Sequence, residues 1–180
     1  MLRCPAPKPA ARTVELDSYL TRVVQRDIPD EAGMMIRSED ALRRWMTAYA
    51  AASSSTARWE TLRDAATPGE GHKPNRKATD GYREALGRLF LLDEVPAWLP
   101  SGNRIKELGQ SPKHQLADPA LAARLLGVGE EALLRGEGDV VRDGPLLGAL
   151  FESLVTLSVR TYAQAVSARA WDCSTHRVWS

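Results

Sequence analysis

The sequence predicts a mostly α-helical fold, for three reasons. Apolar residues recur at helical spacings in several separate segments. Residues that favour helix starts, Ser38 and Asp118, stand just before two of these segments. Stretches rich in Gly and Pro, such as residues 67–77, separate the helical patterns. A content of 43% hydrophobic and 26% charged residues is that of a globular chain.

The first part of the chain is expected to hold a leader and a linker helix. Residues 1–13 are rich in Pro and Ala, a composition typical of a flexible segment. Residues 14–37 predict a linker helix and a hinge. Pro29 has no backbone N–H and its ring clashes with the preceding turn, so we expect this helix to end near Ile28. Its apolar residues are Tyr19, Leu20, Val23, Val24 and Ile28.

Residues 38–100 have the element order of a winged helix-turn-helix, three short helices and an extended wing. The first helix is capped by Ser38, and Ser and Thr before residue 59 are expected to cap the second. A third helix is expected to begin near Thr79, and residues 89–100 resemble a strand and turn. The expected inward residues are Leu42, Trp45, Met46, Tyr49, Trp59, Leu62, Ala66, Tyr82, Leu86, Leu89 and Phe90.

Residues 101–168 predict a short extended piece and further helices. One helix has Asp118 as its cap, Pro119 at its first position and Gly127 just past its end. A long helix follows Asp143, and its broad apolar stripe predicts that it is buried. That stripe comprises Leu147, Leu150, Phe151, Leu154, Val155 and Tyr162. Residues 169–180 show no periodicity and are expected to form an unpatterned tail.

Composition and motifs narrow the function classes. The net charge of +1 provides no overall attraction to nucleic acid, so any such binding needs a local basic patch. No phosphate-binding loop occurs, so ATP hydrolysis by that route is not expected, and no G-x-S-x-G elbow or H-E-x-x-H motif is present. We predict no cofactor. Two cysteines at opposite ends of the chain and no long apolar run favour a cytoplasmic protein without membrane contact.

No metal site is predicted. Cys173 and His176 have a ligand spacing, but a structural zinc needs four ligands and the other half is missing. His72 and His114 have no ligand partners in register, so solvated or hydrogen-bonded histidines are the favoured interpretation.

A basic stretch before and along the third helix is the candidate DNA-binding element. In a winged helix this element enters the major groove, and its lysines and arginines hold phosphates. The alternative is a solvated polar face, because Asp80 and Glu84 are interleaved with the basic residues. The candidate residues are Lys73, Arg76, Lys77, Arg83 and Arg88, with His72 beside them.

Several stretches together resemble one family, among them "YLTRVVQRDIPD", "GYREALGRLFLLDEVPAWLP", "SPKHQLADPALAARLLG" and "GALFESLVTLSVR". They are similar to the domain of unknown function (family 4143 of such domains) that follows the AAA-type ATPase core in many bacterial and archaeal ATPases. The resemblance covers roughly residues 15–168. It implies a winged helix followed by a PD-D/ExK-nuclease-like α/β domain, of which this chain has the helical first part.

The resemblance also implies which parts differ from the family. Glu152 matches the acid on the long helix of the nuclease-like domain, so it is a vestigial nuclease-like acid or simply a residue that reaches solvent. The later strands and the N-terminal ATPase core have no counterpart, so we expect a truncated, non-catalytic chain. Leu150, Phe151 and Leu154 would then lack their usual cover and form an exposed apolar patch that favours self-association.

The sequence therefore predicts an ATPase-associated protein that binds DNA weakly through a winged helix. The alternatives are a module that docks onto an AAA-type ATPase partner or a second copy, and a decayed remnant with no selected function.

Overall fold

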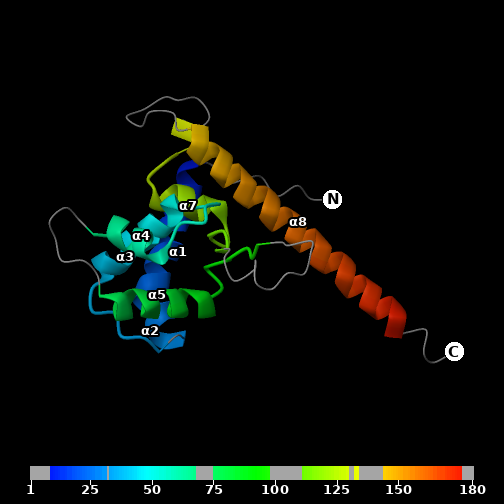
Figure 1. The fold of residues 1–180 in the computed structure, drawn as a ribbon, viewed down its shortest axis with the longest axis horizontal. Helices are drawn as coiled ribbons and strands as arrows, with labels where there is room; N and C mark the ends of the chain where they lie inside the picture. The colour runs from blue at the N-terminus through cyan, green and yellow to red at the C-terminus, as the bar shows by residue number, and fades with distance from the viewer. Residues whose placement is uncertain are drawn as a thin grey trace.

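The computed structural model describes residues 9–31, 33–67, 75–97, 111–129, 132–133 and 144–175. These parts are mostly helical, as predicted (Figure 1). The helices are α1 (Pro9–Arg22), the π-helical turn η1 (Val23–Asp27), α2 (Ile28–Glu31), α3 (Glu39–Ala51), α4 (Trp59–Ala65), α5 (Arg76–Arg88), α7 (Pro119–Leu125) and α8 (Gly144–Thr175).

The first three elements run on without a break, which corrects two expectations. The helix begins at Pro9, so residues 9–13 of the predicted flexible leader are helical, while residues 1–8 lie outside the described parts. It also passes Ile28 and continues to Glu31. In η1 the N–H of Ile28 donates to the oxygen of Val23, five residues back. This wider turn directly precedes Pro29, whose missing N–H and bulky ring a regular α-helix accommodates poorly.

Helix α3 is the centre of the core. The Ser38 hydroxyl accepts a hydrogen bond from the N–H of Ala41 (3.2 Å), which confirms the predicted cap. Trp45 is fully buried and its ring lies 5.5 Å from Tyr49, 6.4 Å from Trp59 and 6.2 Å from Tyr82, between ring centroids. These rings come from α3, α4 and α5, so one aromatic cluster holds the three helices together.

The starts of α4 and α5 differ from the predictions. Helix α4 is preceded by Arg58, which makes no side-chain cap, so the expected Ser or Thr cap is wrong. Helix α5 begins three residues before Thr79, because the Asn75 side chain accepts a hydrogen bond from the N–H of Lys77 (3.0 Å) and caps the helix there. Its buried face is formed by Thr79, Tyr82, Ala85 and Leu86.

Three short extended segments lie side by side next to these helices. Val95 and Lys113 exchange two backbone hydrogen bonds of 2.9 Å, and Leu92 forms a second antiparallel bridge with Leu116. On the other side, the N–H of Ser54 donates to the oxygen of His114 (2.7 Å). The segment 113–117 therefore lies between 91–95 and the connection from α3 to α4. In the described ranges these pairings are isolated bridges and are not extended into longer strands.

Helix α7 packs against both α1 and α3. It begins as predicted, with the Asp118 carboxylate accepting a hydrogen bond from the N–H of Ala120 (2.7 Å), and Gly127 follows it with φ +70°. Arg124 donates to both carboxylate oxygens of Asp17 on α1, at 2.5 and 2.8 Å. A single hydrophobic cluster thus includes residues on both sides of the domain boundary expected at residue 100.

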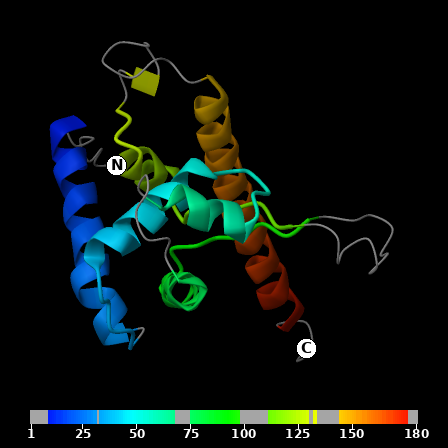
Figure 2. The ribbon, with the colours of Figure 1, turned by 60° about the vertical axis from the view of Figure 1, so that its left-hand side comes forward.

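The other described elements, α1 to α7 and the extended segments, form one body. Helix α8 runs along one edge of this body and extends well past it (Figures 1 and 2). It continues to Thr175, so the predicted tail is helical from residue 169 to that point, whereas Asp143 and His176 lie outside the described parts. The expectation that α8 is buried is wrong, because Phe151 and Tyr162 are exposed and only Leu150 of the predicted stripe is fully buried. No helix in the described ranges is long and apolar enough to cross a membrane.

The Asp17–Arg124 contact generates a pH prediction. The hydrogen bond from Arg124 lowers the pKa of Asp17, so the carboxylate stabilises the fold above its unfolded pKa near 3.8 and loses this contribution as the pH falls through the lower folded value. We expect the difference in unfolding free energy between wild type and Asp17→Asn to shrink below about pH 4. Urea unfolding followed by Trp fluorescence measures it. A difference that stays constant from neutral to strongly acidic pH would contradict the assignment.

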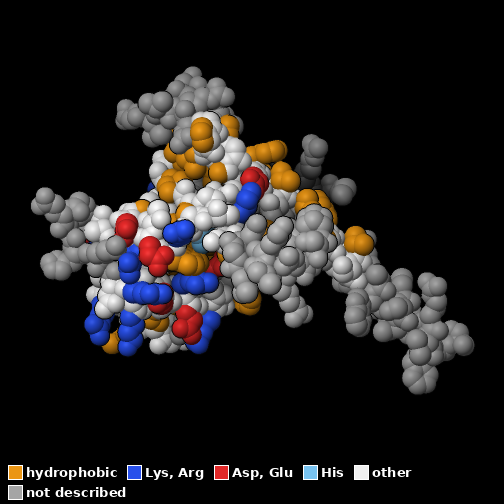
Figure 3. All heavy atoms as spheres, in the orientation of Figure 1, with side chains coloured by type: hydrophobic (Ala, Val, Ile, Leu, Met, Phe, Trp, Pro, Cys, Tyr) orange, Lys and Arg blue, Asp and Glu red, His pale blue; other side chains and the backbone are white. Residues whose placement is uncertain are grey.

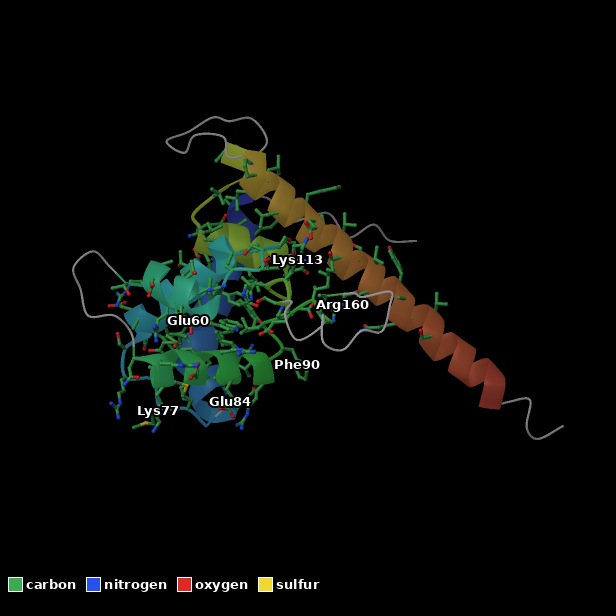
Figure 4. All side chains as sticks on the ribbon, viewed as in Figure 1. Glu60, Lys77, Glu84, Phe90, Lys113 and Arg160 are labelled. Atoms are coloured by element: carbon green, nitrogen blue, oxygen red, sulfur yellow. The ribbon has the colours of Figure 1, made fainter. Side chains whose placement is uncertain are left out.

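The aromatic cluster generates a stability prediction. Trp45→Ala removes the ring that contacts α4 and α5, and we expect a loss of about 3–5 kcal/mol in unfolding free energy. Phe90→Ala is the matched control and should change stability by less than about 0.5 kcal/mol. The expectation that Phe90 faces inward is wrong, because its side chain is 84% exposed and points away from the body (Figure 4). Equal losses in the two variants would refute the central role of Trp45.

Candidate nucleic-acid interface

Helix α5 presents its basic residues to solvent because its other face is fixed in the core. Tyr82 and Leu86 anchor the buried side. The exposed side holds four of the five predicted DNA-binding residues, namely Arg76, Lys77, Arg83 and Arg88. Lys73 and the neighbouring His72 lie outside the described residues. In Figure 3 the basic and acidic side chains gather together over this part of the body.

Two of the four basic residues pair with acids on the same helix. Arg76 lies 3.9 Å from the Asp80 carboxylate, and Arg88 lies 2.9 Å from that of Glu84. All four side chains are more than half exposed, and exposed i,i+4 pairs contribute only about 0.3–0.5 kcal/mol. Such arginines can therefore exchange a carboxylate for a phosphate at little cost. Figure 4 shows Lys77 at the outer end of the helix and Glu84 farther along it.

Arg83 has a different role from its neighbours. Its guanidinium lies 4.2 Å from the centroid of the Trp59 ring, and its Nε is 3.3 Å from the Glu94 carboxylate. It thereby links α4, α5 and the segment 91–95. The sequence grouped Arg83 with the DNA-binding residues, but in the fold its charge is already held by a ring and an acid.

A shallow hollow of about 410 Å³ lies beside the middle of α5. Its lining residues include three carboxylates, those of Asp80, Glu84 and Glu94, and one guanidinium, that of Arg83. An excess of negative charge repels phosphate, so this part of the face does not favour nucleic acid. The basic character is concentrated instead in the first turn, at Arg76 and Lys77.

Glu152 lies on α8, away from α5. Its carboxylate is 2.5 Å from the Lys113 ammonium group, and both side chains are nearly half exposed. Farther along α8, Arg160 lies 2.6 Å from the Asp93 carboxylate. Both pairs attach α8 to the extended segments, and Figure 4 shows Lys113 and Arg160 between the body and α8. In the described residues no group of three or more His, Cys, Asp or Glu could hold a metal ion.

Sequence reasoning missed these two ion pairs. Lys113 is 39 residues from Glu152, and Arg160 is 67 residues from Asp93. Helical periodicity describes neighbours only three or four residues apart, so no local signal could have identified them.

His114 and Tyr49 are buried polar side chains that contact the Trp59 ring. Nε2 of His114 is 2.7 Å from the oxygen of Ala57, which confirms that this histidine is hydrogen-bonded. Burial raises the pKa of Tyr49, whose hydroxyl donates to the oxygen of Gln115 (3.3 Å). These contacts make both side chains part of the aromatic cluster that supports α4.

Comparison with known proteins gives one match. The family described as "Domain of unknown function (DUF8612)" matches residues 5–132, which include every described helix except α8. Neither the curated proteins nor the solved structures contain a match.

The contacts of Arg83 predict that it stabilises the fold. Arg83→Ala removes the contact with Trp59 and leaves Glu94 without this partner, so we expect a loss of about 0.5–1 kcal/mol in unfolding free energy and a change in Trp fluorescence. Lys77→Ala, on the same helix and exposed, should leave both quantities unchanged. An Arg83→Ala variant as stable as Lys77→Ala would show that the contact with Trp59 is not structural.

Proposed function

Because the chain belongs to the family Domain of unknown function (DUF8612), whose description states no activity, we propose a function from the geometry: weak DNA binding by a winged-helix-type module through the first turn of α5. The observation that carries this proposal is the position of Arg76 and Lys77. Both are exposed at the start of a helix whose opposite face is anchored in the core. In helix-turn-helix proteins this end of the recognition helix approaches the bases.

The arrangement around α5 supports a winged-helix interpretation. Three helices, α3, α4 and α5, are joined by one aromatic cluster, and the extended segment 91–95 follows the third helix. This segment pairs with 113–117, as the two sides of a wing would. The hydrogen bonds between 54–55 and His114 connect the same pairing back to the turn between α3 and α4.

The charges explain why the proposed binding is weak. The exposed face of α5 has four basic residues in its described range, but Asp80 and Glu84 lie among them and Glu94 lies beside Arg83. Phosphate contacts provide most of the affinity of a nonspecific DNA binder. A face with so few uncompensated positive charges would therefore bind only at low salt.

We further propose that the chain is non-catalytic on its own. The resemblance assigns one acid of a nuclease-like site to Glu152, and this carboxylate is paired with Lys113. Metal-dependent phosphodiester cleavage needs several carboxylates that converge on the ion. The wider role suggested by the resemblance, in the company of an AAA-type ATPase, stays a hypothesis.

A second candidate function is protein docking, in which α5 has no ligand of its own. The exposed apolar residues of α8 favour this alternative, because patches of this kind mark interaction sites. The partner in that case would be an ATPase or another copy of the chain.

A binding experiment with a fluorescent duplex of random sequence tests the DNA proposal. Arg76→Ala combined with Lys77→Ala should weaken binding at low salt. It should also reduce the slope of log K against log salt by about 2, since each lost phosphate contact changes it by about 0.9. Adding Lys73→Ala should extend the loss, while Arg83 is kept because it supports the fold.

Two control variants make this test specific. The first control, Arg12→Ala with Arg26→Ala, removes the same charge from the N-terminal helical elements and should have little effect on DNA binding. The Arg26–Asp30 pair (3.8 Å) there is as exposed as the Arg76–Asp80 pair. Asp80→Asn with Glu84→Gln removes acids from the α5 face and should tighten binding. If the Arg76/Lys77 variant binds as tightly as wild type, with the same salt slope, the proposal is wrong.

A further inference from the structure

The exposed apolar residues of α8 form a stripe on the side that faces away from the body. Their exposed fractions range from 43% for Val155 to 72% for Tyr162. At about 100° per residue, five of them fall within an arc of about 80° along the helix. These five, here called the α8 stripe, are Phe151, Val155, Val159, Tyr162 and Val166. Leu154 borders it.

The body contacts α8 on the opposite side. Leu150 and Ser153 are buried there, and Arg160 reaches Asp93. On the same helical projection these residues lie roughly 140–160° from the centre of the stripe. Figures 1 and 2 show the outward side of α8 free of the other described elements, so nothing in the described parts of the chain covers the stripe.

The stripe has no charge. Between residues 144 and 167 the only charged residues are Glu152, which lies beside the stripe about 60° from its centre, and Arg160, and both pair with the body. A lipid surface is usually bound by helices with Lys and Arg beside the apolar face, which α8 does not have in this range. An uncharged apolar face of this kind is suited to another protein surface that is equally uncharged.

The intervals between the stripe positions are symmetric about Val155. Two exposed glycines, Gly144 and Gly148, fall within the same arc, and a Cβ on either would meet nothing within 4 Å. With these, the positions are 144, 148, 151, 155, 159, 162 and 166, and the intervals read 4, 3, 4, 4, 3, 4 around Val155. Such a palindrome allows a helix to pair with an antiparallel copy of itself.

We propose that α8 is a homodimer interface, in which the stripe of one copy packs antiparallel against that of a second copy with Val155 at the two-fold axis. Phe151 then faces the partner's Val159. The bulky Tyr162 faces the partner's Gly148, so a large residue meets a small one on each side. Each contact occurs twice, as a two-fold symmetric interface requires.

The buried area fits a modest but specific dimer. Complete burial of the five stripe side chains and of Leu154 would remove at most about 600 Å² per copy from water, or about 1,200 Å² in total, which reaches the lower limit of stable protein interfaces. The match of the bulky Tyr162 to Gly148 across the two-fold axis favours a second copy as the partner. The proposal does not depend on DNA binding.

Molar mass in solution, measured by light scattering after size exclusion, provides the first test. Wild type should be a dimer at micromolar concentration. Val155→Arg places two like charges together at the two-fold axis and should raise the dissociation constant at least about 100-fold. Gln164→Arg is the matched control, because it adds the same charge to an exposed position on the other side of α8, and it should remain dimeric.

Cysteine cross-linking tests the antiparallel geometry in a chain with Cys4→Ser and Cys173→Ser. Val155→Cys should form a disulfide-linked dimer on mild oxidation. Phe151→Cys should not, because the two cysteines would lie about 12 Å apart along the helix axis, beyond disulfide reach. A mixture of Phe151→Cys and Val159→Cys chains should cross-link to each other.

A further variant separates the interface from folding. Gly148→Leu raises helix propensity but fills the space expected for the partner's Tyr162, so helicity by circular dichroism should be kept or increased while the dimer weakens. A monomeric wild type, or cross-linking of Phe151→Cys as readily as Val155→Cys, would overturn the proposal. Helical Val155→Arg chains that dimerise as tightly as wild type would do the same.

Discussion

The packing of rings around Trp45 is the constraint on which the rest of the structure depends. Helix α4 has seven residues and α5 has thirteen, lengths at which an isolated helix is marginal in water. Their stability comes from contact with α3, because Trp59 stacks on Trp45 and Tyr82 meets Trp45 edge to face. His114 extends the same cluster to the extended segments. The orientation of α5, and hence of the candidate DNA-binding face, is set by this cluster.

This dependence limits what α5 can use for binding. The guanidinium of Arg83 contacts the Trp59 ring and the Glu94 carboxylate. One of the residues predicted to bind DNA therefore helps to hold α5 in place. The acids that accompany Arg76 and Arg88 are exposed and exchangeable, but they reduce the local positive potential. The exposed face of α5 therefore serves both the packing of the fold and the proposed DNA binding. This favours a DNA interaction that is weak and sensitive to salt.

Helix α8 shows the opposite division of side chains to that of an ordinary surface helix. The two charged residues between 144 and 167, Glu152 and Arg160, pair with Lys113 and Asp93 of the body, whereas the residues of the α8 stripe point outward. Exposed ion pairs provide little stability, and an uncovered apolar stripe gains nothing from water. A partner on the outer face would explain this arrangement, because it would remove the apolar stripe from water. Helix α8 lies outside the part of the chain that matches the family, which ends at residue 132.

Local chemistry in the sequence was enough to identify the helical class, the Ser38 and Asp118 caps and the inward positions of Leu42, Trp45 and Tyr82, because capping and helical periodicity act over three or four residues. Only the tertiary structure decided the rest. The continuation of the first helix through Pro29 depends on a π-helical turn, and the roles of Arg83 and Glu152 depend on partners distant in sequence. An apolar stripe in the sequence shows that one face of a helix favours burial. Only the packing of the whole chain decides whether other parts of that chain bury it. For α8, the described residues leave the stripe exposed to solvent.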